Sequence, residues 1–213
     1  MKNLIALLAL LLTITVSQPA TAHSVHGDDT TSATTARFAS LFQQAASNQP
    51  PIGGPFTLTD INGQTVTEKS LIGKHHLIFF GFSECKTECP VAMQQITRAY
   101  NQLIPEEQKQ LQVVFISVDP KNDTLPVLKK FITAFNPAFT AWRGEKPEVD
   151  AITRNYLAYY AIKTDGKQQY QVNHSSYIYL MGPQGTYLTH FRGSDADATL
   201  LETLKSILKN TTK

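Results

Sequence analysis

The chain has 213 residues, of which 42% are hydrophobic and 17% are charged, and its formal net charge is +2. This length and composition fit a single globular domain with an extension, and a domain of this size can bury a full hydrophobic core. Basic and acidic residues nearly balance, so charge gives no reason to expect a nucleic-acid partner, and we predict none.

The N-terminal residues 1–22 have the features of an export signal. Lys2 provides a positive charge, Leu4–Val16 is apolar but shorter than the ~20 residues of a membrane-spanning helix, and Ala20-Thr21-Ala22 matches a small-x-small cleavage pattern. We expect cleavage before His23 rather than retention as an anchor. The protein is therefore predicted to be exported to the periplasm or the outer face of the inner membrane, where disulfides are permitted.

Residues 23–51 are polar and rich in Ser, Thr, Ala and Gln, and we interpret them as a flexible segment before a compact domain over residues 52–213. A β-hairpin is predicted to open this domain, with the strands Phe56–Thr59 and Gln64–Val66 on either side of Asn62-Gly63. An Asn-Gly pair between such strands is a strong hairpin signal because both residues adopt the required turn easily.

Two continuous apolar runs, His76–Phe82 and Leu111–Val118, are typical of central parallel strands covered on both faces. Periodicity and capping signals predict four helices. The first is Val91–Leu103, and the second is capped by Asp123 or Thr124. The third begins at Pro147, with Tyr156, Leu157 and Tyr160 facing inward, and the fourth follows Gly193 and is capped by Ser194 or Asp195. The other elements are the strands Phe139–Trp142, Ser176–Met181 and Thr186–Phe191, and a polar loop over Lys163–Gln171 with an Asp165-Gly166 turn. This order predicts an α/β fold, namely a single thioredoxin-like domain with an N-terminal β-hairpin and an enlarged loop before the final hairpin.

Cys85 and Cys89, the only cysteines of the sequence, lie where a predicted central strand passes into a helix. Backbone N–H groups and the positive end of the helix dipole favour the thiolate there. Three roles compete for this pair. A structural disulfide would close so short a loop that it would constrain the unfolded chain little. A dithiol redox couple fits an oxidising compartment, and a metal site fits two soft thiolates one helical turn apart.

His174 is a candidate third participant, at the start of the strand predicted over Ser175–Met181. A thioredoxin-like fold brings its last hairpin back beside the active loop, so a histidine there can complete a Cys-Cys-His triangle. Such a set suits Cu(I), whereas Cu(II) needs a further oxygen or nitrogen ligand. A solvated or packed residue is the more common role of a single histidine, and this interpretation stays open.

A series of motifs runs through about residues 53–208, in the order Gly53-Gly54-Pro55-Phe56, Phe80-Gly81-Phe82, Cys85-x-x-x-Cys89-Pro90, Ile116-Ser117-Val118-Asp119-Pro120, Glu148-Val149-Asp150, Val172-Asn173-His174 and Tyr179-Leu180-Met181-Gly182-Pro183. In these motifs the chain closely resembles the Sco/SenC family of copper-binding cytochrome c oxidase assembly proteins. The resemblance implies a thioredoxin-like fold and binding of Cu(I) and Cu(II) through Cys85, Cys89 and His174. It also implies a role in metallating the CuA centre of oxidase subunit II, by delivering copper, by reducing its cysteines, or both.

The cysteine loop departs from the family pattern in its charges. The family usually has an acidic residue inside the loop and another before the histidine, whereas this chain has Thr87 and Asn173 there. Glu84 and Glu88 flank the cysteines instead, so thiolate basicity and copper affinity are expected to differ from the family norm. Many members are also anchored in the membrane, whereas the N-terminal segment here matches a cleavable signal.

The predicted mature N-terminus carries His23 and His26, and a free amine beside an imidazole can chelate Cu(II). We therefore hypothesise a weak auxiliary copper site there, although short histidine-bearing tails are usually only solvated. Asp119 ends a central strand near the expected site, where it either caps a turn or orients a ligand. Packed or solvated roles are expected for Met93, His75, His76 and His190.

We predict a copper metallochaperone rather than an enzyme, with oxidase subunit II as its partner and other periplasmic copper carriers or thiol reductants as further partners. The alternative is an extracytoplasmic thiol-disulfide oxidoreductase that reduces partner cysteines through Cys85 and Cys89. Oxidoreductases of this fold carry a cis-proline beside the active cysteines, whereas this chain has Val172-Asn173-His174 in that region, which favours metal binding. A peroxiredoxin-type peroxidase lacks support, because the loop carries glutamates where such an enzyme needs a nearby arginine.

Overall fold

The computed structural model of the chain describes residues 51–164, 170–193, 195 and 197–209. These residues belong to one compact unit. The predicted export signal over residues 1–22, the copper-binding hypothesis for His23 and His26, and the Asp165-Gly166 turn all fall outside the described residues. In the part of the chain that the structure describes, no helix has the length and apolar character needed to cross a membrane.

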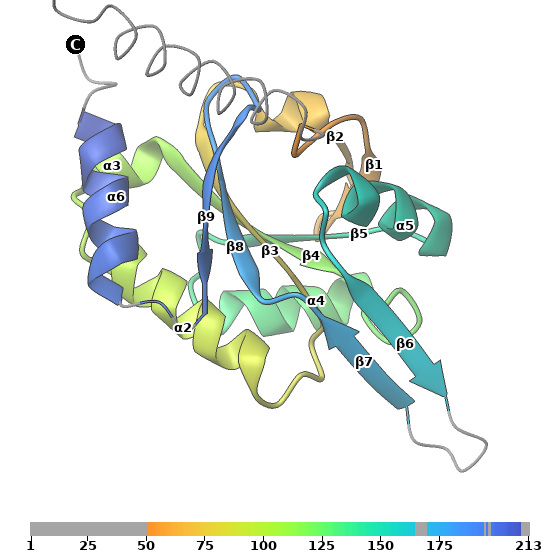
Figure 1. Ribbon diagram of the computed structural model, residues 1–213. Helices are drawn as coiled ribbons and strands as arrows, with labels where there is room; N and C mark the ends of the chain where they lie inside the picture. The colour runs from red at the N-terminus through yellow and green to blue at the C-terminus, as the bar shows by residue number, and fades with distance from the viewer. Residues whose placement is uncertain (1–50, 165–169, 194, 196, 210–213) are drawn as a thin grey trace, which may run out of the picture. The chain divides into compact units, whose positions relative to one another are not determined.

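A seven-stranded sheet with the order β2-β1-β5-β4-β3-β8-β9 forms the centre of this unit (Figure 1). Its strands are β1 (Thr57–Asp60), β2 (Thr65–Thr67), β3 (His75–Gly81), β4 (Leu111–Ser117), β5 (Thr140–Arg143), β8 (Tyr177–Met181) and β9 (Tyr187–Arg192). The helices are the 3-10 turn η1 (Glu68–Leu71) and α2 (Glu88–Asn101), α3 (Pro105–Lys109), α4 (Leu125–Thr133), α5 (Lys146–Asn155) and α6 (Asp197–Lys209). A separate two-stranded sheet consists of β6 (Tyr160–Thr164) and β7 (Tyr170–His174).

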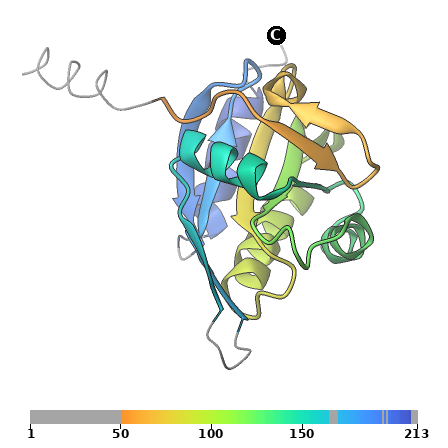
Figure 2. The same cartoon turned by 90° about the vertical axis from the view of Figure 1, so that its right-hand side faces the viewer.

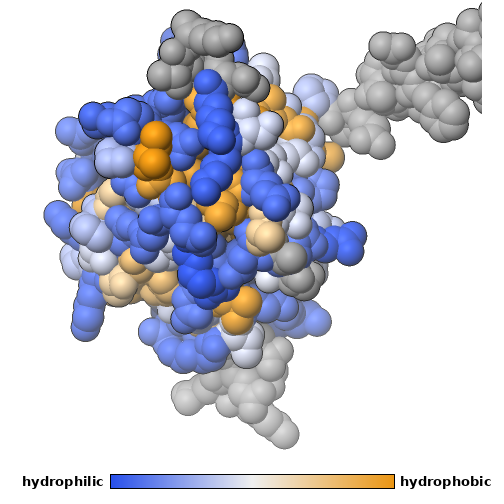
Figure 3. Space-filling model, turned by 90° about the vertical axis from the view of Figure 1, so that its left-hand side faces the viewer, coloured by the Kyte–Doolittle hydropathy of each residue, from blue (hydrophilic) through white to orange (hydrophobic). Residues whose placement is uncertain are grey.

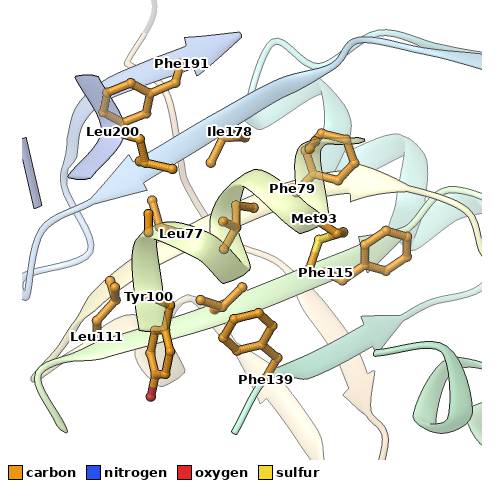
Figure 4. Packing of buried hydrophobic residues seen from close by; sticks show 14 of the residues in the cluster. Leu77, Phe79, Met93, Tyr100, Leu111, Phe115, Phe139, Ile178, Phe191 and Leu200 are labelled. Carbon is orange, nitrogen blue, oxygen red and sulfur yellow. The ribbon is translucent and has the colours of Figure 1, made fainter. Parts of the chain in front are cut away.

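The two continuous apolar runs form the centre of the sheet, as predicted. β3 and β4 pair in parallel, with Phe79 opposite Phe115, and every residue of β3 is buried. Successive side chains of a strand point to opposite faces, so β3 supplies two cores. Leu77 and Phe79 pack with α2, α4 and α6, whereas Ile78 and Phe80 pack with α5. In Figure 4, Met93 of α2 lies close to Phe79 and Phe115 in the first of these cores.

The predicted N-terminal hairpin is confirmed by the pairing of Leu58 with Val66. The polar loop predicted over Lys163–Gln171 is wrong at both ends, because β6 and β7 extend into it and pair with each other. Ile162 lies opposite Val172, and a cross-strand apolar pair of this kind stabilises a hairpin. His174 therefore ends β7 rather than starting the next strand. Figures 1 and 2 both show this hairpin extending beyond the central sheet.

Of two predictions about helix ends, one is confirmed in position only and the other is wrong. Thr124 occupies the N-cap position of α4 but makes no side-chain capping bond, and the side chain of Asp123 is bonded elsewhere. Leu157 was expected to face inward, but α5 ends at Asn155 and Leu157 is 56% exposed. It adopts a left-handed conformation with φ 51°, because its N–H and that of Ala158 turn back to bond the last carbonyls of the helix.

The face shown in Figure 3 is largely hydrophilic, with apolar side chains surfacing between polar ones. Scattered apolar residues of this kind are normal for a protein surface and identify no site by themselves. Function is therefore best sought where reactive side chains converge, at the carboxyl end of β3.

Candidate metal centre

The short loop between β3 and α2 carries Cys85, and the first turn of α2 carries Cys89. Gly81 ends β3 directly beside the second sulfur, since a Cβ atom on this glycine would lie 2.7 Å from Cys89 Sγ and 2.9 Å from Phe115 Cε2. A glycine is therefore needed for the sulfur to pack against the end of the strand. The N–H of Cys85 donates a hydrogen bond to the carbonyl of Phe82 at 3.2 Å, which closes a tight turn before the helix.

The two thiols are held in unequal states. A hydrogen bond from the Cys89 side chain lowers the pKa of Cys85 to about 4, against the opposing effect of burial, and hydrogen bonds from the backbone of Cys89 and Thr87 lower it further. The Cys89 N–H donates to Cys85 Sγ at 3.4 Å, as expected at a helix N-terminus. The same interaction with Cys85, together with burial, raises the pKa of Cys89. Cys85 is thus the thiolate and Cys89 the thiol of the pair.

His174 presents one defined ring nitrogen to the cysteines. Its Nδ1 lies 3.0 Å from the carbonyl oxygen of Ser175, and since a carbonyl only accepts, Nδ1 carries the proton. Nε2 therefore has a free lone pair, and it lies 3.3 Å from Cys89 Sγ. The rings of Phe79 and Phe82 meet the imidazole edge-on, with centroids at 5.9 and 5.7 Å, and restrict its orientation.

The sulfurs of Cys85 and Cys89 and a ring nitrogen of His174 all lie within 4.8 Å of one another. Two thiolates and an imidazole are soft or borderline donors, and three of them at this spacing fit Cu(I). No carboxylate of the described residues belongs to this group, so a fourth ligand for Cu(II) would come from elsewhere. A hollow of about 670 Å³ opens beside the group and is lined by Phe82, Glu84, Cys85, Lys86, Thr87, Glu88, Val172, Asn173 and His174.

Comparison with known proteins identifies the family of this chain, because the SCO1/SenC family model matches residues 44–209. The chain belongs to the SCO1/SenC family. The mitochondrial protein SCO2 of Saccharomyces cerevisiae is 37% identical over 139 residues, which are 64% of this chain and 46% of that relative. The chain thus spans about half of this relative's length. The predicted family resemblance is confirmed.

Two solved structures show the same fold. The crystal structure of yeast Sco1 with copper bound matches with a TM-score of 0.69 and 33% identity, over 75% of this chain and 90% of that one. BsSco, described as a member of the Sco family of cytochrome c oxidase assembly proteins with a disulfide switch, matches with a TM-score of 0.60 and 27% identity, over 78% and 99%. The predicted α/β, thioredoxin-like fold is therefore confirmed.

In this SCO1/SenC protein, the residues at the unusual loop positions all border the hollow. Thr87 and Asn173 line it, as do Glu84 and Glu88. Glu84 forms an exposed ion pair with Lys86 at 3.0 Å, which cancels part of the local negative charge and contributes little to stability. The acidic character expected beside the cysteines is thus present at the mouth of the hollow, outside the ligand group itself.

The other candidate residues have packed or solvated positions. Asp119 accepts hydrogen bonds from the backbone and side chain of Asn122 at 3.3 and 2.9 Å, which supports the turn-capping role. Met93 is fully buried in the core. Burial lowers the pKa of His76 to about 4, so it is neutral within the sheet. His190 is exposed, and its Nδ1 lies within hydrogen-bond distance of the Tyr187 hydroxyl, at 2.6 Å.

Asp123 lies near the site, although the sequence predicts only a helix-capping role for it. Asp123 is fully buried and accepts bonds from the backbone and hydroxyl of Ser83 and from the hydroxyl of Ser117. Burial raises its pKa, against the opposing effect of these bonds. The sequence contains a weak signal for this cluster, since Ser83 and Ser117 each lie at or just beyond the end of a buried strand, but nothing in the sequence pairs them with Asp123.

Proposed function

We propose that this protein binds copper through Cys85, Cys89 and His174 and supplies it to cytochrome c oxidase, at the CuA centre of subunit II. The observation that carries this proposal is the convergence of three soft donors within 4.8 Å, from a loop, a helix start and a hairpin end. Copper is bound in the yeast Sco1 structure, and BsSco is described as belonging to a family of cytochrome c oxidase assembly proteins.

The arrangement suits a site that receives and releases its metal. Cys85 is already a thiolate, so a cation meets one charged ligand at once, while Cys89 gives up its proton as it binds. His174 offers Nε2 without losing a proton. Three donors leave Cu(I) able to accept a further thiolate, and the hollow beside them lets an incoming ligand approach. Exchange onto the cysteines of an acceptor protein can therefore proceed one ligand at a time.

A second function, thiol-disulfide exchange, is favoured by the low pKa of Cys85. Its thiolate would attack a partner disulfide and displace one partner thiolate. Cys89, after losing its proton, would then attack the mixed disulfide, leaving a Cys85–Cys89 disulfide and a reduced partner. The two sulfurs are close enough for this step, and the description of BsSco names a disulfide switch. The raised pKa of Cys89 slows resolution, so we rank this function below copper binding.

We further propose that the protein is exported, that residues 1–22 are removed, and that residues 23–51 link the site-bearing domain over residues 52–213 to its surroundings. It would then act in the periplasm or on the outer face of the inner membrane. Other copper carriers or thiol reductants of that compartment would reload or reduce the cysteine pair.

Copper titration of the reduced protein and of His174→Ala tests the proposed function, with reduction potentials measured on the same samples. We expect one Cu(I) per wild-type chain and a loss of at least tenfold in affinity in His174→Ala. His190→Ala is the matched control, because it removes an exposed histidine outside the ligand group and should leave binding unchanged. Absence of copper binding by the reduced wild type, together with rapid reduction of a disulfide peptide from subunit II, would establish the second function instead.

A further inference from the structure

The carboxylate of Asp123 makes an unusual set of contacts for a buried charge. Its residue is 0% exposed. The Ser83 N–H donates to Oδ2 and Oδ1 at 3.2 and 3.3 Å, and the Ser83 hydroxyl donates to Oδ1 at 2.5 Å. The Ser117 hydroxyl donates to Oδ2 at 2.6 Å. These hydrogen bonds from the two serines compensate the burial of the carboxylate.

These contacts join three segments that are separate in the sequence. Asp123 lies just before α4, and its N–H donates to the carbonyl of Asp119 at 3.0 Å. Ser117 ends β4 and is the pairing partner of Gly81 at the end of β3. Ser83 belongs to the loop that carries the first cysteine. The carboxylate therefore lies under the carboxyl ends of the two central strands, where the metal centre is built.

Ser83 occupies a decisive place in the cysteine loop. The hydrogen bond from the Cys85 N–H to the Phe82 carbonyl closes a turn in which Ser83 is the second residue. The same turn thus carries Cys85 at its end and, at its start, the Phe82 ring that borders His174 at 5.7 Å. Bonds that fix the backbone and hydroxyl of Ser83 therefore fix both ends of this turn. One end is the candidate ligand Cys85, and the other is Phe82, whose ring packs against the candidate ligand His174.

We propose that Asp123 is a positioning residue for the metal centre, which holds the Phe82–Cys85 turn so that Cys85 is placed correctly toward Cys89 and His174. This inference rests on the proposed function in so far as it concerns copper. A carboxylate is costly to bury, and strong hydrogen bonds to both of its oxygens offset that cost here. Because the loop is preorganised in this way, a metal need not order it on binding.

The test compares Asp123→Ala, Asp123→Asn and two serine variants in the full chain. Asp123→Ala removes every bond to the turn, and we expect Cu(I) affinity to fall at least tenfold and the sulfur-to-copper charge-transfer spectrum of the Cu(II) form to change. In Asp123→Asn the amide oxygen still accepts from Ser83 and the amide nitrogen can donate to Ser117 Oγ, so affinity should return to within threefold of wild type. Equal losses of affinity in both variants would overturn the positioning role.

Ser83→Ala and Ser117→Ala form a matched pair, which also serves if Asp123→Ala does not fold. Each removes one serine hydroxyl bond to the same carboxylate, at 2.5 and 2.6 Å, but only Ser83 lies in the cysteine turn. Both should lower the unfolding temperature similarly, while only Ser83→Ala should alter the copper spectrum. Identical copper spectra in the two variants would show that Asp123 has a purely structural role.

A copper-free measurement separates this inference from the proposed function. Equilibration with glutathione reports the effective concentration of Cys85 relative to Cys89. We expect this effective concentration to fall several-fold in Ser83→Ala and to stay at the wild-type value in Ser117→Ala. If the wild type binds no copper but this difference appears, the proposed function fails while the positioning role stands. No difference between the two variants in this measurement would contradict the positioning role itself.

Discussion

Replacement of Gly81 by alanine tests whether the strand end sets the position of Cys89. The added Cβ would lie 2.7 Å from Cys89 Sγ, whereas ordinary contact begins at 3.4 Å, so the sulfur must move by about 0.7 Å if the strand stays in place. Phe115 cannot make room in the other direction, because its ring would lie 2.9 Å away and is fully buried. Overpacking of this kind costs about 1–3 kcal/mol of unfolding free energy.

The same displacement of the Cys89 sulfur should also lower the affinity of the site for copper. Ligand distances in metal sites hold to within about 0.2 Å, so a shift of about 0.7 Å cannot be absorbed without distorting the donor set. We expect Gly81→Ala to lower Cu(I) affinity by at least about tenfold, equivalent to about 1.4 kcal/mol. Competition with a chromophoric Cu(I) chelator measures the affinity, and thermal unfolding of the copper-free protein measures the stability.

Gly144→Ala provides the matched control. Its Cβ would lie 2.6 Å from Leu58 Cδ2 and 2.8 Å from Glu148 Cβ, so it overpacks the protein similarly without touching a candidate ligand. Both variants should therefore unfold at lower temperature, but only Gly81→Ala should lose copper affinity. Equal copper affinity in the two variants would refute the argument that the glycine determines the sulfur position.

Four further predictions concern the two thiols, a helix end and the N-terminal segment. Because the pKa of Cys85 is lowered to about 4, its alkylation by iodoacetamide should stay constant as pH falls from about 8 to 5, whereas an ordinary thiol slows about tenfold per unit. Copper binding near pH 7 should accordingly release about one proton, from Cys89, and release of two would contradict the assigned states. Leu157→Gly should raise the free energy of unfolding by about 1 kcal/mol and the unfolding temperature by about 2–4 °C, because a left-handed conformation strains leucine but not glycine. An unchanged unfolding temperature would show that the strain is negligible. Deletion of residues 23–29 should remove a weak Cu(II) site while the main site is retained, and unchanged copper stoichiometry would exclude the auxiliary site.

The sequence predicted most of the sheet because its signals are local. The continuous apolar runs of β3 and β4, and the Asn62-Gly63 turn between β1 and β2, depend on neighbouring residues alone. The hairpin β6–β7 was missed because its polar residues were interpreted as a loop, whereas a hairpin outside the main sheet needs few apolar pairs. The sequence predicts an inward-facing Leu157 because hydrophobic periodicity does not show where a helix ends, and α5 ends at Asn155.

The sequence by itself determined the candidate ligands. Two cysteines at a strand-to-helix junction and a histidine in the family's motif can be identified without coordinates, because residue type and spacing carry that information. Only the tertiary structure decided how the three are arranged and which of their atoms carry protons. The unequal pKa values of Cys85 and Cys89 arise from a hydrogen bond and burial, and the available nitrogen of His174 is set by the Ser175 carbonyl. The role of Asp123 depends on bonds across 40 residues of sequence to Ser83, a contact that exists only because β3 and β4 end side by side.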